Sequence, residues 1–250
     1  MKLPRLLLLS GAWLILLGCQ NPPNSPYRQA ESAQPYYYAT FYEQPKTLDP
    51  ARSYSADEYR IICQIYEPPL QYNYLTRPYA LEPLTTDSIP HPRRCTASSD
   101  SSGVTAPEGC CICYDIRIKP GIFYQPHPCF AQDAPGQYTY RRLSSSDVAA
   151  IHDISDFAQR GTRELKASDY IYQLYRLADP RNNSPIAPIM AKYILGFDEL
   201  SQSLRAALEQ ERAQRRALAG SAYNQQADEQ ERPIRLEYSR FPFPGAAHQD

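Results

Sequence analysis

Prolines divide this chain into short segments, because the proline ring fixes φ and removes a backbone hydrogen-bond donor. The chain contains 24 of them. Prolines also mark the ends of expected helices, since the apolar pattern between Ala56 and Tyr66 stops before Pro68, and the helix that begins at Lys166 stops at Pro180. The sequence therefore predicts many turns and irregular connections between its helices and strands.

The first 18 residues have the pattern of an export signal. Two basic residues precede an apolar run, Leu6 to Leu17, that is too short to span a bilayer stably. Cys19 follows this run and a glycine, as in the lipobox of bacterial lipoproteins. We therefore predict a signal peptide over residues 1–18 and a lipidated Cys19. The alternative is an ordinary signal peptide followed by a chance cysteine.

Residues 19–35 are polar, rich in proline and asparagine, and without periodicity. Such a segment cannot bury a core and is typical of a solvated tether. We therefore expect a periplasmic protein that is held to a cell-envelope membrane by its lipid anchor. The formal net charge of −1, without a long basic run, gives no electrostatic reason to expect nucleic acid as a partner.

Six cysteines follow Cys19, and an exported chain meets an oxidising compartment that favours disulfides. Cys63 lies in an apolar helical pattern and is expected to be a buried thiol. The remaining five are disulfide candidates with open connectivity: Cys95, Cys110, Cys111, Cys113 and Cys129. The C-x-x-C of Cys110 and Cys113 leaves a redox or metal site as an alternative, but no second pair or suitably spaced histidine completes it. We expect no metal and no cofactor.

The patterns along the chain predict a mixed α+β (α/β) fold. Residues 94–113 form a Ser/Cys-rich surface insertion. Strands are expected at 36–41, at 71–75 and from 234, and the alternation of Tyr114, Ile116 and Ile118, followed by a Pro-Gly turn, predicts a hairpin. Three helices are expected from the following apolar residues at helical spacing: Val148, Ile151, Ile154 and Phe157; Ile171, Leu174, Tyr175 and Ala178; and Leu200, Leu204 and Leu208 in a long helix that is broken near Gly196.

No motif nominates a catalytic nucleophile together with its base. The four histidines are scattered, and the charged run from Glu209 to Arg216 is explained by opposite charges at helical spacing. The acidic pair Asp57 and Glu58 is explained by its position at a helix start. The sequence therefore offers no candidate catalytic residues, and we do not expect an enzyme.

Four segments resemble the extracellular solute-binding proteins of family 5, the oligopeptide- and dipeptide-binding components of ABC importers. Thr47-Leu48-Asp49-Pro50 matches that family's T-L-D-P turn, and Tyr66-Glu67 with Leu70 resembles its Tyr-Glu-x-Leu segment, with two prolines interposed. The stretch from Tyr114 resembles a strand-turn segment of the family, but the Asp-Gly that follows it there is missing. The fourth segment resembles an "L-T-A-x-D" helix through the following matches: Leu165, Ala167, Asp169 and Arg176. Lys166 replaces the capping threonine.

This resemblance implies that residues 36–245 form a partial N-terminal lobe of a two-lobed, periplasmic-binding-protein-like type II fold, and that the chain ends before the second lobe. It implies capture of an oligopeptide or dipeptide and delivery to the permease subunits of an ABC transporter. The ligand-binding candidates near the cleft are Asp49, Ser53, Tyr54 and Glu67. Two other interpretations stay open: a structural or adhesin-like envelope lipoprotein that uses exposed tyrosines, and a disulfide- or metal-dependent enzyme built on the Cys95–Cys129 cluster.

Overall fold

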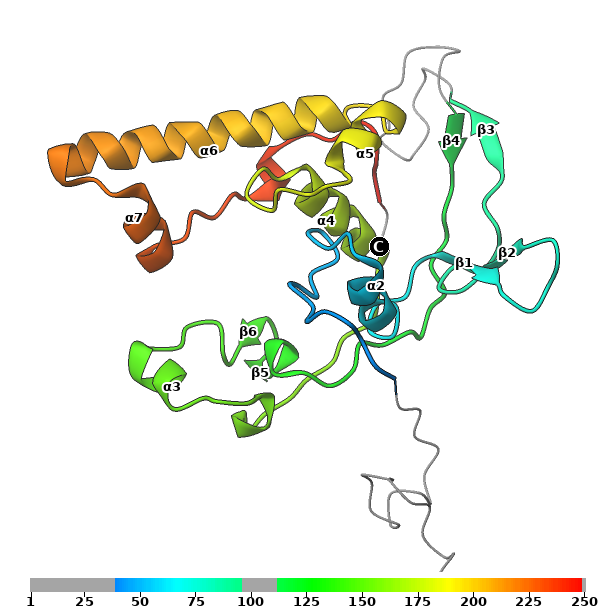
Figure 1. Ribbon diagram of the computed structural model, residues 1–250, viewed down its shortest axis with the longest axis horizontal. Helices are drawn as coiled ribbons and strands as arrows, with labels where there is room; N and C mark the ends of the chain where they lie inside the picture. The colour runs from blue at the N-terminus through cyan, green and yellow to red at the C-terminus, as the bar shows by residue number, and fades with distance from the viewer. Residues whose placement is uncertain (1–38, 96–111, 249–250) are drawn as a thin grey trace, which may run out of the picture. The chain divides into compact units, whose positions relative to one another are not determined.

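The computed structural model describes residues 39–95 and 112–248 (Figure 1). The predicted signal peptide, Cys19, the tether and most of the 94–113 insertion lie outside the described residues. Within the described ranges the chain has six α-helices and three two-stranded antiparallel sheets, so the expected mixed fold class is confirmed. The chain separates into units 1–44 and 45–250, and the second of them is described below.

Each strand pairs with the next strand in sequence. The pairs are β1 (Leu70–Asn73) with β2 (Ala80–Pro83), β3 (Pro92–Arg94) with β4 (Ile112–Tyr114), and β5 (Gln132–Ala134) with β6 (Gln137–Tyr138). The α-helices are α2 (Ala56–Ile62), α3 (Ser145–Ala149), α4 (Ala167–Ala178), α5 (Ala187–Tyr193), α6 (Phe197–Ala219) and α7 (Gln225–Glu231). Single 3₁₀ turns cover Pro128–Phe130, Ile154–Asp156, Gly220–Ala222 and Tyr238–Arg240.

The main hydrophobic core lies between α4, the first half of α6 and the C-terminal segment. Its buried members are Ala51, Leu177, Ala178, Phe197, Leu200, Leu204 and Phe243. The predicted helical stripe of α6 is confirmed, because Leu200, Leu204 and Leu208 are all buried. Gly196 begins this helix with a positive φ of 73°, which confirms the expected break between α5 and α6.

Helix α4 ends in a buried acidic residue, Asp179, whose side chain is 1% exposed. Arg181 donates from Nε to both Asp179 carboxylate oxygens at 3.0 Å, and the Tyr238 hydroxyl donates to Oδ2 at 2.7 Å. Burial alone would raise the pKa of Asp179, but these hydrogen bonds bring it below its ordinary value. Tyr238 belongs to the C-terminal segment, and its bond to the Asp179 carboxylate connects this segment to α4. The Tyr238 ring also stacks on Tyr175 of α4.

The second half of α6 is stabilised by ion pairs and not by a core. Arg212 binds Glu229 of α7 at 2.8 Å, and Arg215 binds Asp228 of α7 at 3.0 Å. Arg215 also pairs with Glu211 one turn away on α6. The expectation that helical charge pairing explains the run from Glu209 to Arg216 is therefore confirmed, and α7 supplies partners that the sequence pattern had not indicated (Figure 1).

The strand expected from residue 234 is absent from the structure. This segment runs as irregular chain into the Tyr238–Arg240 turn, and no strand among the described residues lies beside it to complete a ladder. It is held instead by side chains of α4 and by close backbone packing. The Tyr175 hydroxyl donates to the Phe241 carbonyl at 2.8 Å, and a Cβ on Gly245 would come within 1.8 Å of the Leu195 carbonyl oxygen.

The hairpin expected around residues 114–124 is also absent. A turn does form at Pro120-Gly121, but the two sides of it pair with different parts of the chain. Ile118 bridges to Thr86, whereas Phe123 bridges to Glu164. The half-buried strand expected from Tyr114 to Ile118 is not formed, because residues 115–117 have no strand structure and Tyr114 and Ile116 are exposed. The bridges that do form join segments distant in sequence, which a local pattern does not specify.

Two further local predictions are wrong. The helix expected from Val148 to Phe157 is replaced by the short α3 and a separate 3₁₀ turn, because the Asp153 carboxylate accepts the Ser155 N–H and begins a new turn. Val148 and Ile154 remain exposed, whereas Phe157 packs edge to face on Tyr140, so the expected residues do not form one buried stripe. Residues 39–41, the described part of the strand expected at 36–41, have no strand structure.

Replacing Leu204 with alanine should lower the free energy of unfolding by about 2 to 5 kcal/mol, because it removes a buried side chain and leaves a cavity. The matched control is Leu218→Ala on the same helix, where the side chain is 89% exposed and the change should be about 0.5 kcal/mol or less. Urea denaturation of both variants measures the difference. Equal losses for the two variants would contradict the assigned core.

Candidate functional site

The T-L-D-P segment forms a tight turn that is closed by the Asp49 backbone and side chain. Asp49 Oδ1 accepts the Ala51 N–H at 3.0 Å, and the Asp49 carbonyl accepts the N–H groups of Arg52 and Ser53 at 3.0 and 2.9 Å. The Asp49 N–H in turn donates to the Thr47 hydroxyl at 3.1 Å. This pattern, with an aspartate that bonds the backbone two residues ahead, is the usual way in which Asp fixes a turn.

The same aspartate joins the turn to α4. Arg176 Nη2 lies 2.6 Å from Asp49 Oδ2, and both side chains are about three-quarters buried, with exposures of 27% and 25%. Partial burial alone would raise the pKa of the Asp49 carboxyl, but the hydrogen bonds from Arg176 and Ala51 bring it below its ordinary value. Asp49 is therefore a charged structural residue, and its two oxygens already have partners.

The beginning of α2 is organised by Glu58. Ser55 caps the helix with its hydroxyl, which accepts the Glu58 N–H at 3.1 Å. The Glu58 carboxylate accepts five hydrogen bonds from the preceding segment, namely those of Lys46 N–H, Thr47 N–H, the Ser53 hydroxyl at 2.7 Å, Tyr54 N–H and Ser55 N–H. The expectation that Glu58 is a helix-start residue is therefore confirmed.

These bonds to the charged form lower the pKa of Glu58 to about 2, and the bond from the Ser53 hydroxyl contributes most. Glu58 is buried in spite of its charge. The carboxylate therefore stabilises the turn and the helix start together, and the Ser53 side chain is already engaged with it.

The four predicted ligand residues are not equivalent in the structure. The side chains of Asp49 and Ser53 are occupied by Arg176 and Glu58. Tyr54 is 73% exposed, and the side chain of Glu67 faces solvent while its backbone carbonyl accepts the Tyr170 hydroxyl at 3.0 Å. Only Tyr54 and Glu67 thus present side chains that are free to meet a ligand.

Tyr170 of α4 makes a second long-range connection. Its hydroxyl lies 2.6 Å from the hydroxyl of Thr85, which is fully buried, and 3.0 Å from the Glu67 carbonyl oxygen. Burial raises the pKa of Tyr170, so its hydroxyl stays protonated and able to donate. The Tyr170 side chain of α4 therefore bonds both Glu67, in the segment that follows α2, and Thr85, in the loop that follows β2.

The cysteines divide into a disulfide and two thiols. Cys95 and Cys113 form a disulfide with a Cα–Cα distance of 5.4 Å, and it closes the loop that the sequence identified as a surface insertion. Cys110 and Cys111 lie outside the described residues. Cys129 is an exposed free thiol, and Cys63 is also exposed. The expectation of a buried Cys63 is wrong, because this residue caps the C-terminus of α2 and does not lie on its packed face.

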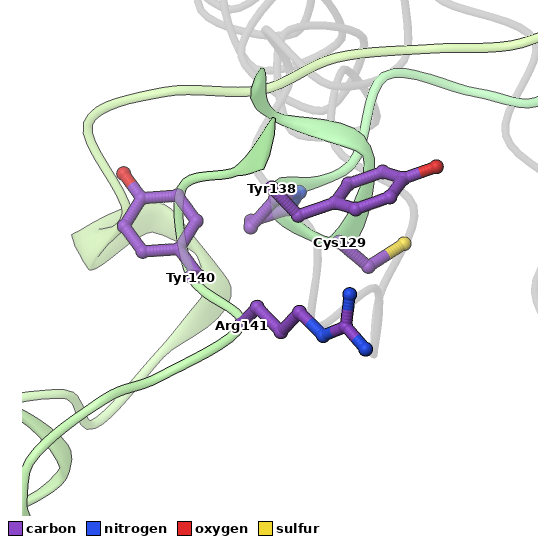
Figure 2. A pocket seen from close by; sticks show the side chains of 5 residues that line it. Cys129, Tyr138, Tyr140 and Arg141 are labelled. Carbon is purple, nitrogen blue, oxygen red and sulfur yellow. The ribbon is translucent and has the colours of Figure 1, made fainter. Parts of the chain in front are cut away.

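A surface pocket of about 360 Å³ lies in a different region, beside β5 and β6. It is lined by Pro128, Cys129, Tyr138, Tyr140 and Arg141. Figure 2 shows the Arg141 guanidinium on the same side of the pocket as the Cys129 sulfur, with the Tyr138 ring beside the thiol. The volume is at the lower end of the range for small-molecule sites. Aromatic walls and one guanidinium suit a small apolar group that carries a negative charge.

The Cys129 thiol in this pocket has no base. Its backbone N–H donates to His127 Nδ1 at 3.1 Å, so this imidazole nitrogen is occupied. Burial raises the pKa of Cys129, which keeps the sulfur in its less nucleophilic protonated form. The pocket therefore lacks an activated nucleophile. Nothing in the sequence pattern had marked it, because its lining residues come from the 3₁₀ turn Pro128–Phe130, from β6 and from the turn after β6, without a shared motif.

No group of three potential metal ligands occurs within residues 39–95 and 112–248. Over the same ranges, no helix is long and apolar enough to cross a membrane. Comparison with protein-family models, with curated proteins and with solved structures finds no match to this chain.

Stability should depend on the protonation of Glu58 at acidic pH. Its carboxyl has a pKa of about 2 in the folded chain against an ordinary value of 4.5, so the bonds to the carboxylate contribute fully above that value and are lost as the pH falls toward 2. Glu58→Gln should therefore show a flatter decline of unfolding free energy across this window than the wild type. Denaturant titrations at a series of pH values measure the difference.

Other carboxylates with lowered pKa values, such as Asp49 and Asp179, remain in both proteins, so the difference between the two curves isolates Glu58. Parallel curves for the variant and the wild type would show that Glu58 titrates in its ordinary range.

Proposed function

We propose that this chain is the substrate-binding lipoprotein of an ABC importer, which captures peptides or similar small solutes in the periplasm and delivers them to a membrane permease. In this proposal the segment from residue 45 contributes to the first lobe of a two-lobed, periplasmic-binding-protein-like fold. Cys19 carries the lipid that keeps the protein at the membrane. The chain performs no chemistry on its ligand.

The observation that carries this proposal is the ion pair between Asp49 and Arg176. The two residues are 127 positions apart and belong to the first and the last of the four segments that resemble solute-binding proteins. The Tyr170–Glu67 bond joins the second segment to the fourth in the same way. Segments that resemble one family and also contact one another in space form a stronger argument than separate short motifs.

The third segment also joins this network. The Tyr124 N–H donates to the Arg163 carbonyl at 3.0 Å, and the Arg163 guanidinium lies 4.9 Å from the centre of the Tyr124 ring. Arg163 Nη1 in turn bonds the Asp169 carboxylate at 2.9 Å. Burial is the main reason why the pKa of Tyr124 rises to about 12. All four segments are thus linked through α4 or the residues directly before it.

A second candidate function is a structural or adhesin-like envelope lipoprotein. It is favoured by the many tyrosines whose rings are largely exposed, of which Tyr42 and Tyr193 are the most exposed at 96% and 82%. Exposed aromatic side chains are enriched in protein-binding surfaces. The enzyme interpretation receives less support, because Cys95 and Cys113 are consumed by a disulfide and Cys129 lacks a base.

Peptide binding is tested by isothermal titration of the full chain in detergent with a pool of short peptides. We expect saturable binding that Tyr54→Ala and Glu67→Gln weaken about three- to tenfold, because both side chains are free to meet a ligand. The matched control is Tyr193→Ala, an equally exposed tyrosine outside the four segments, which should leave the affinity unchanged. Absence of binding across the pool would favour the structural lipoprotein.

Lipidation is tested by expressing the chain in bacteria that are fed radiolabelled palmitate. The wild-type chain and a Cys63→Ala control should carry the label, whereas Cys19→Ala should not, because the thioether at that sulfur is the attachment point of the diacylglycerol. Label on Cys19→Ala, or an unlabelled wild type, would contradict the lipoprotein assignment without bearing on peptide binding.

A further inference from the structure

The hairpin of β1 and β2 exposes five large apolar side chains within ten residues. These residues, 72–81, are named the hairpin tip. Its exposed members are Tyr72, Tyr74, Leu75, Tyr79 and Leu81, and the highest exposures are 76% for Tyr74 and 81% for Leu75. Single exposed apolar residues are ordinary, but several in one short loop mark an interaction surface.

The hairpin tip holds its own shape. Asn73 Oδ1 accepts the N–H groups of Leu75 and Thr76 at 3.0 and 3.2 Å. Arg77 Nη1 donates to the carbonyl oxygens of Tyr74 and Thr76 at 2.6 and 2.9 Å. Four backbone groups of the tip are therefore satisfied without water or a partner.

Two of the three aromatic rings of the tip are held by contacts within it. The Arg77 guanidinium lies 4.1 Å from the centre of the Tyr79 ring, and the Tyr72 and Tyr79 rings meet edge to face at 6.4 Å. Ordering the Tyr72 and Tyr79 rings on binding thus costs less conformational entropy, because these two rings already have partners in the tip.

The tip carries a single formal charge, which is positive. Arg77 is the one residue among 72–81 that carries a formal charge. Glu82 follows directly, but its carboxylate accepts the side-chain amides of Gln71 and Asn73 at 2.7 and 2.9 Å at the base of the hairpin. The tip therefore offers apolar and tyrosine surface with a single positive charge.

We propose that the hairpin tip inserts into the headgroup region of an anionic lipid bilayer. Tyrosine rings are favoured at the membrane–water interface, where one edge is apolar and the hydroxyl remains wet. A loop can enter a region of low polarity only when its backbone groups are satisfied internally, as they are around Asn73 and Arg77. The cation suits the negative surface of anionic lipids. This contact goes beyond the transport proposal and does not depend on peptide binding.

The experiment places a tryptophan at the tip and asks what surrounds it. The full chain carries a single tryptophan, Trp13, so Trp13→Phe removes the native tryptophan fluorescence. On that background Leu75→Trp reports on the tip, and Leu218→Trp, which replaces an equally exposed leucine on α6, is the matched control. Both chains are mixed with vesicles of phosphatidylcholine and phosphatidylglycerol, with and without bromine on the acyl chains. Because both chains carry the same N-terminal segment, any affinity of that segment for vesicles is equal in the two samples.

We expect the emission of Leu75→Trp to shift to the blue on vesicle addition and to be quenched by brominated lipid at least twofold more than that of Leu218→Trp. Emission of Leu75→Trp that stays at its water-exposed position, or quenching equal to that of the control, would overturn the proposal. A blue shift that appears without vesicles as the protein concentration rises would overturn it in favour of a protein partner, a second copy of the chain. Tyr74→Trp gives an independent reporter should Leu75→Trp fail to fold.

The lipid composition tests the role of the cation. Quenching on pure phosphatidylcholine vesicles should be weaker than on vesicles that contain phosphatidylglycerol, and added salt should reduce the difference. Equal quenching on both vesicle types would overturn the anionic preference that is assigned to Arg77.

Discussion

The buried carboxylate of Asp179 is the interaction on which most of this structure depends. An isolated buried charge is costly, so its position at the end of α4 requires the donors of Arg181 and Tyr238. Tyr238 belongs to the C-terminal segment, and Arg181 also donates to the Ile234 carbonyl of that segment. Satisfying one charge thus fixes the C-terminal segment against α4, and the core with α6 forms between them.

Helix α4 extends this role toward the earlier part of the chain. In its first turn Asp169 bonds Arg163, and Tyr170 bonds Thr85 and Glu67; in its last turn Arg176 bonds Asp49. The sheets are small and contribute no common layer, since each joins only neighbouring strands. Side-chain bonds from one helix therefore take the place of a large sheet in connecting distant segments. This arrangement also explains why Asp49, which sequence resemblance nominates for ligand binding, is engaged within the protein, whereas Ser53 is engaged by Glu58 of α2.

The surfaces that remain available are aromatic. The pocket beside β5 and β6 has tyrosine walls with Arg141 (Figure 2). The hairpin tip has tyrosines with Arg77. Tyrosine tolerates both water and apolar partners, because its ring is apolar and its hydroxyl is polar. A chain with 21 tyrosines can therefore expose many of these rings while their hydroxyl groups remain hydrated. The proposed lipid anchor and the proposed membrane contact of the tip would both hold the chain near a bilayer, although they act through unrelated residues.

The sequence by itself determined the elements whose signals are local. Helical spacing predicted α4 and α6, Gly196 predicted the break before α6, and alternating charges predicted its ion pairs. The tertiary structure alone decided which segments pair. Ile118 pairs with Thr86, Phe123 pairs with Glu164, and the segment after residue 234 packs on α4 instead of forming a strand. It also decided that Asp49 faces Arg176 and that Glu58 collects five donors. Backbone periodicity is a property of neighbouring residues, whereas the partner of a strand or a charge is set by how the whole chain closes around its core.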